Sequence, residues 1–297
     1  MRLIFRFLGK ILLLLPIWVL ALFSNLLGYF LYFCVPYRRK VIRQQMAKTL
    51  FNGQDSPPLN KLVRRNYIHY ANLFFEFLIL SAMNLREKRF FDRHFRIVGK
   101  EAMHQALAQG RGVVAVNLHL GLWEAMGACC GHYVGHVTVP VKFLKNPFAQ
   151  YLRERMQAHP EVTLVDTRMG RERAAKLLSA LRNGTVAAIF MDQYTPSEAF
   201  SPFFGHAART TSAAAVLARK TGSPVFISYM LREGTLKYAM VLKPIELKPE
   251  WLTRRDEAGL SEIVACFNRH IEEAIRAHPE QWLWAHRRFK ENPEFQY

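Results

Sequence analysis

The hydrophobic and polar positions divide the chain into a short apolar region and a longer region of mixed pattern. From Ile11 to Tyr37 the sequence ILLLLPIWVLALFSNLLGYFLYFCVPY contains no charged residue. A helix of about 20 apolar residues crosses the hydrocarbon core of a bilayer, so this run predicts a membrane segment. Pro16 and Asn25 are the positions at which such a helix would kink or become re-entrant.

The charges that flank this run favour a retained anchor over a cleaved signal peptide. Arg2, Arg6 and Lys10 precede it, as in a signal peptide, but the run is too long and no small-x-small cleavage site follows. The next charges, in YRRKVIRQQMAK, are basic and favour a body that lies on the cytoplasmic side of an inner membrane. We therefore predict an anchor with basic flanks over residues 1–45.

The remaining residues, 46–297, have the pattern of one α/β domain. Apolar residues at helical spacing in residues 56–83 predict a long amphipathic helix that packs on the body or along a membrane surface. From about Phe95, short apolar runs alternate with helical runs, which is typical of a mostly parallel central sheet flanked by helices. The predicted strands are FRIVG, GVVAVN, HVTVPVKF, VTLVD, TVAAIFMD and PVFISYML, and a last long helix covers about 258–277.

The candidate chemistry begins where GVVAVN gives way to LHLGLWE. His119 follows the strand, and ligands of open α/β sheets bind at the carboxyl ends of the strands. Glu124 would lie in the first turn of the next helix, so the two side chains meet only if His119 is on the loop. A histidine backed by a carboxylate is a general base of fixed tautomer for a hydroxyl. A structural histidine and a helix-start glutamate are the alternative.

Other chemistries find little support in the sequence. There is no GxSxG, P-loop or GxGxxG, and the adjacent Cys129 and Cys130 fall within a helical run. His132 and His136 are four apart but lack the glutamate of HExxH, so we expect no metal and no cofactor. The four cysteines form no CxxC, which suits reduced thiols. Lys and Arg outnumber Asp and Glu by 41 to 23, and the net charge of +18 predicts an anionic partner.

Together, HLGLWE and several later blocks resemble the bacterial lipid A biosynthesis acyltransferases, which add secondary acyl chains. The chain looks similar to lauroyl and myristoyl transferases within the lysophospholipid acyltransferase superfamily. The resemblance covers the apolar run and roughly residues 95 to 290. Its blocks are HLGLWE, NPFAQYLRERM, GRERAAKLLSALRNGTVAAIFMDQ, PFFGHAARTTSAAAVLARKTGSPV and PEQWLWAHRRFK. Many relatives read N-H-x-G-N-W-E at the first block, whereas here Asn117 stands two positions before the histidine and Leu122 replaces the polar residue.

The resemblance implies a glycerolipid acyltransferase-like fold and roles for individual residues. His119 would be the base and Glu124 would orient it, while an acyl carrier protein would supply the acyl donor and a phosphorylated glycolipid the hydroxyl. Arg155, with Arg153 as a neighbouring alternative, would steady the substrate or oxyanion. The remaining assignments are a phosphate or oxyanion contact for Arg171 and a place at the ligand-facing edge for Asp192 and Gln193. Apart from the resemblance, if backbone N–H groups at the helix start stabilise the oxyanion of the thioester transition state, Gly121 would allow close approach.

Each of these assignments has a structural alternative. Arg155 and Arg171 could be exposed helix residues, and Asp192 could cap a turn. PFFG is expected to pack against a cleft. WLWAHRRFK could anchor the chain at the membrane interface or hold phosphates of the substrate.

Two other functions stay open at the level of sequence. The same chemistry could act on a lysophospholipid, an ornithine-type lipid or another glycolipid. A non-catalytic, membrane-tethered basic protein that binds nucleic acid or acidic lipid is also compatible with the charge, although the predicted dyad argues against it and against a nucleic-acid partner.

Overall fold

The computed structural model describes residues 2–35, 37–196, 198–254 and 256–297. The order of helices and strands along the chain confirms the predicted α/β class, and each predicted strand is present. The strands are β1 (Phe95–Val98), β2 (Val113–Asn117), β3 (Val137–Val141), β4 (Val162–Asp166), β5 (Val186–Phe190), β6 (Phe200–Phe203), β7 (His206–Arg209), β8 (Val225–Gly234) and β9 (Lys237–Ile245).

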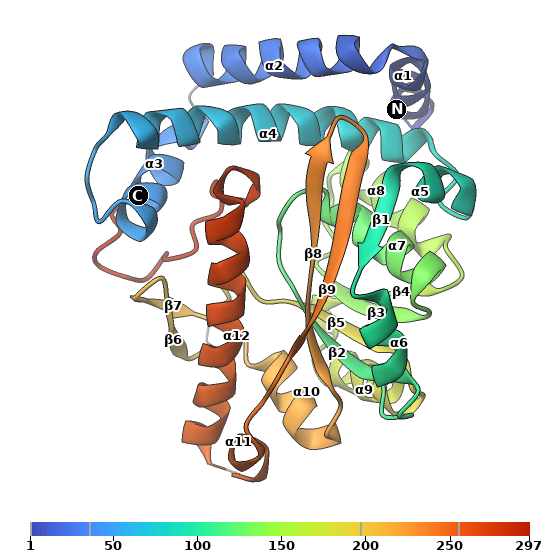
Figure 1. The fold of residues 1–297 in the computed structure, drawn as a ribbon, viewed down its shortest axis with the longest axis vertical. Helices are drawn as coiled ribbons and strands as arrows, with labels where there is room; N and C mark the ends of the chain where they lie inside the picture. Colours follow the sequence, from blue (N-terminus) through green and yellow to red (C-terminus); the bar gives the residue numbers. More distant parts are fainter. Residues whose placement is uncertain (1, 36, 197, 255) are drawn as a thin grey trace.

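The helices alternate with these strands in the body of the molecule, and α1 to α5 precede the first strand at the N-terminal end (Figure 1). They are α1 (Arg2–Leu14), α2 (Ile17–Cys34), α3 (Arg39–Leu50), α4 (Pro57–Ala82), α5 (Lys88–His94), α6 (Lys100–Leu107), α7 (Met126–Tyr133), α8 (Pro147–Gln157), α9 (Arg171–Arg182), α10 (Ala213–Thr221), α11 (Pro249–Thr253) and α12 (Glu257–Ala277). Three short 3₁₀ turns are η1 (Trp123–Ala125), η2 (Thr167–Met169) and η3 (Pro279–Gln281).

Seven strands form the central sheet in the order β1-β9-β8-β2-β5-β3-β4. Neighbouring strands are parallel except β8 and β9, which form an antiparallel hairpin. The mostly parallel sheet is therefore confirmed. The hairpin strand β9 and the small β6–β7 pair are not among the predicted strands.

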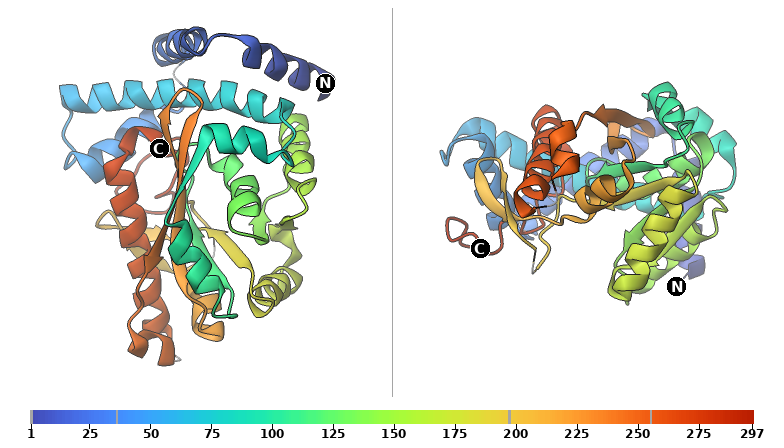
Figure 2. Two further views of the ribbon diagram at one scale, coloured as in Figure 1. Left: turned by 45° about the vertical axis from the view of Figure 1, so that its right-hand side comes forward. Right: turned by 90° about the horizontal axis from the view of Figure 1, so that it is seen from below.

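The sheet is covered on both faces, as its apolar strands require. Alternate residues of β2 enter two separate cores, because successive side chains of a strand point to opposite faces. Val114 and Val116 pack with residues of α9, α10 and α12, whereas Val113 and Ala115 pack with residues of α6 and α7. Figure 2 shows these helices on the two sides of the sheet.

Helix α4 lies across the end of the sheet, close to the tip of the β8–β9 hairpin (Figure 1). Ser56 caps its start by accepting a hydrogen bond from the Leu59 N–H, and two prolines follow the cap. The predicted helix over residues 56–83 is thus confirmed. The buried face of α4 contains the polar residues Asn66, His69 and Glu76 as well as apolar ones, so this face is not purely apolar.

The charge-free run forms parts of two helices, α1 and α2, that are interrupted at Leu15 and Pro16. Both pack against α4 at glycines: a Cβ on Gly9 would lie 2.1 Å from the Leu78 carbonyl oxygen, and one on Gly28 2.6 Å from Ile68 Cα. In the described part of the chain, α2 is the one helix long and apolar enough to cross a membrane. It lies along α4 and does not stand away from the body (Figure 1).

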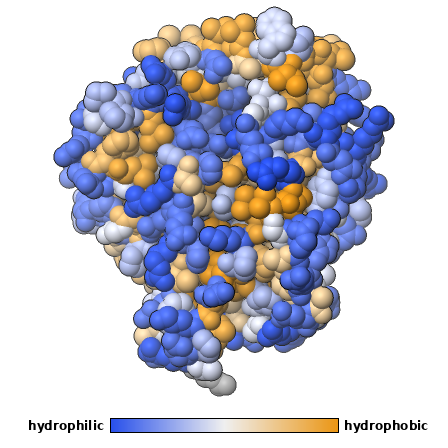
Figure 3. All heavy atoms as spheres, viewed as in Figure 1, coloured by the Kyte–Doolittle hydropathy of each residue, from blue (hydrophilic) through white to orange (hydrophobic). Residues whose placement is uncertain are grey.

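The outer faces of α1 and α2 carry large exposed apolar side chains. Trp18 is 69% exposed and Phe33 66% exposed. An apolar band follows α2 along the edge of the molecule in Figure 3. We call this outer face of α1 and α2 the apolar ridge; its members with the greatest exposure are Leu3, Ile4, Phe7, Leu14, Ile17, Trp18, Leu26, Phe30 and Phe33.

The predicted boundary between anchor and body, at residues 45–46, falls inside α3. That helix packs on the C-terminal segment, where the Gln45 Nε2 amide donates to the Trp284 carbonyl oxygen at 2.6 Å. All four cysteines are free thiols, with Cys34 exposed and the other three buried.

Candidate active site

The register of two central strands brings a histidine and an aspartate together. β2 and β5 are parallel neighbours in which Asn117 pairs with Phe190. His119 and Asp192 each lie two residues beyond that pair, so they leave the sheet side by side at its carboxyl edge. This is the edge at which open α/β sheets bind ligands.

Both oxygens of the Asp192 carboxylate are engaged. Oδ1 lies 2.8 Å from His119 Nδ1, and Oδ2 accepts from the His119 backbone N–H at 2.7 Å and from the Trp282 indole N–H at 2.7 Å. The side chain is 1% exposed, and burial acts to raise its pKa. The positive charge available on His119 and the donors from His119 and Trp282 outweigh burial, so the pKa lies below its usual value of 3.8.

An ionised Asp192 determines which nitrogen of His119 carries the proton. A carboxylate only accepts hydrogen bonds, so Nδ1 is the donor and Nε2 keeps a free lone pair. Nε2 faces the side-chain amide of Gln193, whose nitrogen is 3.3 Å away. The ring packs between Phe190 and Trp123, and its side chain is 18% exposed. The imidazole is therefore held in one orientation, with Nε2 turned away from Asp192 and the side chain partly exposed.

Glu124 lies on the 3₁₀ turn η1, which leads into α7. Burial raises its pKa, while the attraction of His119 and a hydrogen bond from Trp123 act in the opposite direction. Among the hydrogen bonds of the described residues, none joins Glu124 to His119, and the carboxylate on Nδ1 is that of Asp192. The strand register thus places Asp192, not Glu124, in hydrogen-bond contact with Nδ1, and an orienting role for Glu124 stays a prediction.

Two residues of the C-terminal segment, His286 and Arg288, complete the surroundings of Asp192. His286 Nε2 accepts from the Tyr194 N–H at 2.9 Å, and burial lowers the pKa of His286 to about 4. Arg288 is fully buried, donates to the carbonyl oxygens of Gln193 and Arg209, and stacks over Phe203. Burial lowers the pKa of Arg288 to about 10, against the attraction of Asp192.

The burial of both indoles excludes one of the two roles predicted for WLWAHRRFK. Trp282 is 1% exposed and Trp284 is fully buried, so these indoles cannot anchor the chain at a membrane interface. Arg288 donates to protein carbonyls, and Arg287 is exposed and stacks on Tyr297. PFFG contributes to the core: Phe203 is fully buried against Trp282 and Phe289.

The two predicted arginines lie apart from the histidine. Arg155, on α8, donates to the carbonyl oxygen of Met83 at the end of α4. Arg171 begins α9 and is exposed; it follows β4, which is three strand positions or roughly 14 Å from β2. In the part of the chain that the structure describes, neither guanidinium hydrogen-bonds to His119, Asp192 or Gln193.

Gly121 allows a close approach, as expected, but to the backbone of β8 and not to an oxyanion. Its φ is +59°, and a Cβ would lie 2.1 Å from the Met230 carbonyl oxygen, so glycine is required for close approach to β8. Its N–H donates to the Gln281 carbonyl oxygen at 3.1 Å and is not available to an oxyanion.

The site contains no arrangement suited to a metal. His132 Nε2 lies 2.8 Å from the Leu85 carbonyl oxygen, whereas His136 lies beside Thr163. Across the described ranges, no group of three or more His, Cys, Asp or Glu side chains could hold an ion.

A cavity of about 410 Å³ lined by His136, Thr163 and Lys176 lies near the amino ends of β3 and β5, away from His119.

The sequence matches a known family over nearly its whole length. The model of the bacterial lipid A biosynthesis acyltransferases covers residues 3–291. The chain belongs to this family. It is 28% identical over 262 residues to a lipid A biosynthesis palmitoleoyltransferase of Escherichia coli strain K12. That alignment covers 86% of this chain and 80% of the relative. It is also 28% identical over 206 residues to a lipid A biosynthesis lauroyltransferase of the same organism, with 68% and 64% covered.

Family membership decides between the classes of function left open by the sequence. The chain is an acyltransferase, and its family acts in lipid A biosynthesis. The non-catalytic alternative is thereby set aside.

Proposed function

We propose that the protein transfers a fatty acyl chain from acyl carrier protein to a hydroxyl of a lipid A precursor, with His119 as the general base. The observation that supports this most directly is the Asp192 carboxylate on His119 Nδ1, which leaves the Nε2 lone pair directed at the Gln193 amide and not at Asp192. A hydroxyl that displaces the Gln193 amide from Nε2 would lie within reach of the base.

The reaction needs no covalent enzyme intermediate. Nε2 takes the hydroxyl proton as the oxygen attacks the thioester carbonyl carbon, and the new C–O bond gives a tetrahedral oxyanion. Collapse of that species breaks the C–S bond, and the thiolate leaving group takes the proton from the imidazolium. The products are an ester and a free thiol. Asp192 stabilises the imidazolium through Nδ1, and Glu124 adds a second negative charge near the ring.

Charge favours the proposed donor and acceptor. The net charge of +18 attracts an acidic carrier protein and a phosphorylated glycolipid. Arg171 is exposed at the same edge of the sheet as His119, so it remains our candidate for a phosphate contact. Arg155 is bound to Met83, and we assign it the placement of α8 against α4.

The test is a transfer assay with purified protein in detergent micelles. The substrates are an acyl-loaded carrier protein and a lipid A precursor that lacks secondary chains, and mass spectrometry detects the added acyl group. We expect transfer by the wild type and its loss in His119→Ala. Lysophospholipid and ornithine-type lipid, offered in parallel, test the alternative acceptors. Full activity of His119→Ala would contradict the mechanism.

We also propose that the protein is attached to the cytoplasmic leaflet of the inner membrane through the apolar ridge. Since α2 packs along α4, an α2 that crossed the bilayer would carry the exposed Lys61 and Arg65 of α4 to the same depth. Charged side chains at that depth cost several kcal/mol each. Helices α1 and α2 are therefore better placed in the plane of one leaflet.

Thiol labelling from one side of the membrane separates the two orientations. Lys10→Cys and Lys40→Cys, made separately in a Cys34→Ser background, lie before and after α2. With α2 in the plane of the leaflet, an impermeant maleimide should label both in inverted inner-membrane vesicles. Labelling of Lys40→Cys alone would indicate that α2 spans the membrane.

A further inference from the structure

We propose that residues 281–283 form a clamp that positions the base and its carboxylate for catalysis. The proposal rests on the assignment of His119 as the base. We call this segment the 281–283 clamp; it belongs to the terminal sequence QWLW.

The clamp holds the backbone of the histidine loop on both sides of Leu120. The Leu283 N–H donates to the His119 carbonyl oxygen at 3.2 Å, and the Gly121 N–H donates to the Gln281 carbonyl oxygen at 3.1 Å. Leu120 and Trp282 form an antiparallel bridge between these two bonds. A loop that leaves a strand end is ordinarily mobile, but this one is paired like a strand.

The same segment also reaches the carboxylate. The Trp282 indole donates to Asp192 Oδ2, and its ring is 1% exposed. Three consecutive residues thus fix the backbone of the base and the side chain of its partner. Small displacements of reacting groups reduce the rate strongly, so this arrangement bears directly on catalysis.

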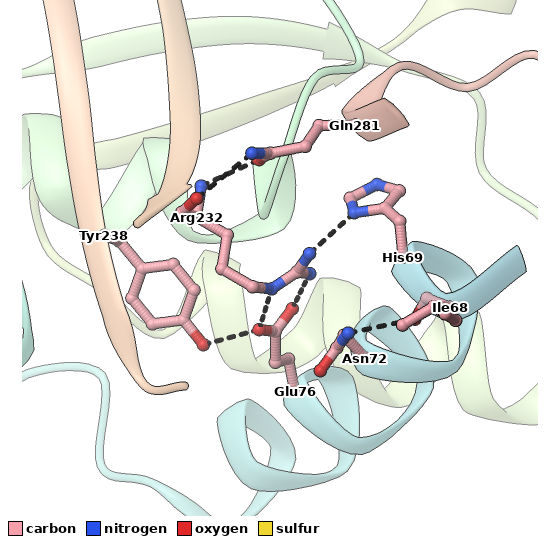
Figure 4. Close-up of polar contacts among 7 residues, drawn as sticks. All are labelled: Ile68, His69, Asn72, Glu76, Arg232, Tyr238 and Gln281. Atoms are coloured by element: carbon pink, nitrogen blue, oxygen red, sulfur yellow. Dashed lines mark hydrogen bonds and ion pairs between the residues drawn. The ribbon is translucent and has the colours of Figure 1, made fainter. Parts of the chain in front are cut away.

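The clamp is fastened to the sheet through the side chain of Gln281. Its Oε1 accepts from the Arg232 N–H at 2.9 Å, and its Nε2 donates to the Arg232 carbonyl oxygen at 3.0 Å (Figure 4). β2 pairs with β8 only as far as Ser228, so the edge of β8 is unpaired by β2 at Arg232. The glutamine amide continues the pairing there, because it offers one donor and one acceptor as a peptide group does.

A buried ion pair ties this anchor to α4. The Arg232 guanidinium binds both oxygens of Glu76 and lies 2.7 Å from His69 Nδ1, while the Tyr238 hydroxyl donates to Glu76 (Figure 4). The two charged side chains are 10% and 6% exposed. Burying such a pair is expensive, and its complete hydrogen bonding keeps Arg232 in one position.

A second tie joins α4 to the clamp directly. The Asn66 side-chain amide donates to the carbonyl oxygens of Glu280 and Trp282 at 2.8 and 2.9 Å. Asn66 is fully buried. Helix α4 therefore supports the clamp at two places, through Asn66 and through Arg232.

The first test replaces one indole and compares it with its neighbour. Trp282→Phe removes a donor from Asp192, whose other charged or titratable neighbours are His119, His286 and Arg288. The pKa of Asp192 should rise, so the acid limb of the pH profile of acyl transfer should move to higher pH by roughly half a unit to one unit. Trp284→Phe is the matched control, because its indole is equally buried but donates to the Pro279 carbonyl oxygen.

A readout independent of turnover is the low-field proton resonance of His119 Nδ1–H in detergent micelles, identified by its absence in His119→Gln. It should shift in Trp282→Phe and stay in place in Trp284→Phe. Equal behaviour of the two variants in this resonance would overturn the proposal. A wild type that transfers no acyl group would refute the proposed function, while the resonance would still decide the role of the clamp.

A second variant addresses the anchor without loss of volume. Gln281→Glu keeps an acceptor for the Arg232 N–H but places an oxygen against the Arg232 carbonyl. We expect kcat to fall roughly tenfold while KM for both substrates stays within about twofold, because positioning acts on the chemical step. A KM effect with kcat unchanged would assign Gln281 to substrate binding and overturn its positioning role.

Discussion

At the residue scale, two carboxylates lie near one imidazole, and only Asp192 is hydrogen-bonded to it. Asp192→Asn should lower kcat by about 10³- to 10⁴-fold, because an amide at this place can stabilise the wrong tautomer of His119. Glu124→Gln should cost about tenfold or less, since it removes charge without removing the bond to Nδ1. Single-turnover rates with both variants measure the difference. A larger loss in Glu124→Gln would return the orienting role to Glu124.

His286 gives a second prediction at this scale, for stability against pH. Burial lowers its pKa from 6.5 to about 4, so the unfolded chain binds a proton more readily than the folded one. The stability that neutral His286 contributes is present above pH 6.5 and is lost as the pH falls towards 4. In detergent, the melting temperature of His286→Gln should fall less over this range than that of the wild type. Parallel curves for the two proteins would contradict this.

At the scale of elements, the loop between β2 and η1 depends on a glycine with two constraints. Gly121 has a positive φ and also lies against the Met230 carbonyl oxygen. Gly110 has a φ of +74° but nothing within 4 Å of an added Cβ. Gly110→Ala should cost about 1 kcal/mol from backbone strain alone.

Gly121→Ala should cost more than Gly110→Ala and should also reduce acyl transfer, because the clash displaces the loop that carries His119. Chemical denaturation and the transfer assay on the two variants isolate the effect of the clash. Equal destabilisation with full activity in both would show that the close approach to β8 does not matter.

At the scale of the whole molecule, apolar area and net charge act together on membrane attachment. Replacing Trp18, Phe23 and Phe30 of α2 by Ser removes three exposed aromatic rings from the apolar ridge. Each ring buried in lipid contributes about 1.5–3 kcal/mol, so binding to mixed phosphatidylethanolamine–phosphatidylglycerol vesicles should weaken by roughly 1,000-fold or more. Co-sedimentation measures this, and Val216→Ser on α10 is the control with an exposed apolar residue elsewhere. Retention of the triple variant even in high salt would exclude the apolar ridge as the anchor.

The sequence by itself determined the features that depend on local pattern. Alternating apolar and helical runs predicted the α/β class, since side-chain periodicity follows directly from backbone geometry. The apolar run GVVAVN predicted a buried strand, and the position of His119 just after it predicted a place at the ligand-binding edge of the sheet. The motif blocks identified the family and drew attention to Asp192 and Gln193, whose contacts no local pattern could specify.

The tertiary structure alone decided which side chains meet. Asp192 contacts His119 from 73 positions away because β2 and β5 are neighbouring strands in a fixed register. The order of strands in a sheet cannot be predicted from the residue pattern of a single strand. Spacing along the chain therefore favoured Glu124, which is near in sequence but not hydrogen-bonded. For the same reason, the sequence did not predict the buried contacts of Arg288 and Trp282 or the packing of α2 along α4. These are contacts between residues far apart in the sequence, which form only when the chain folds.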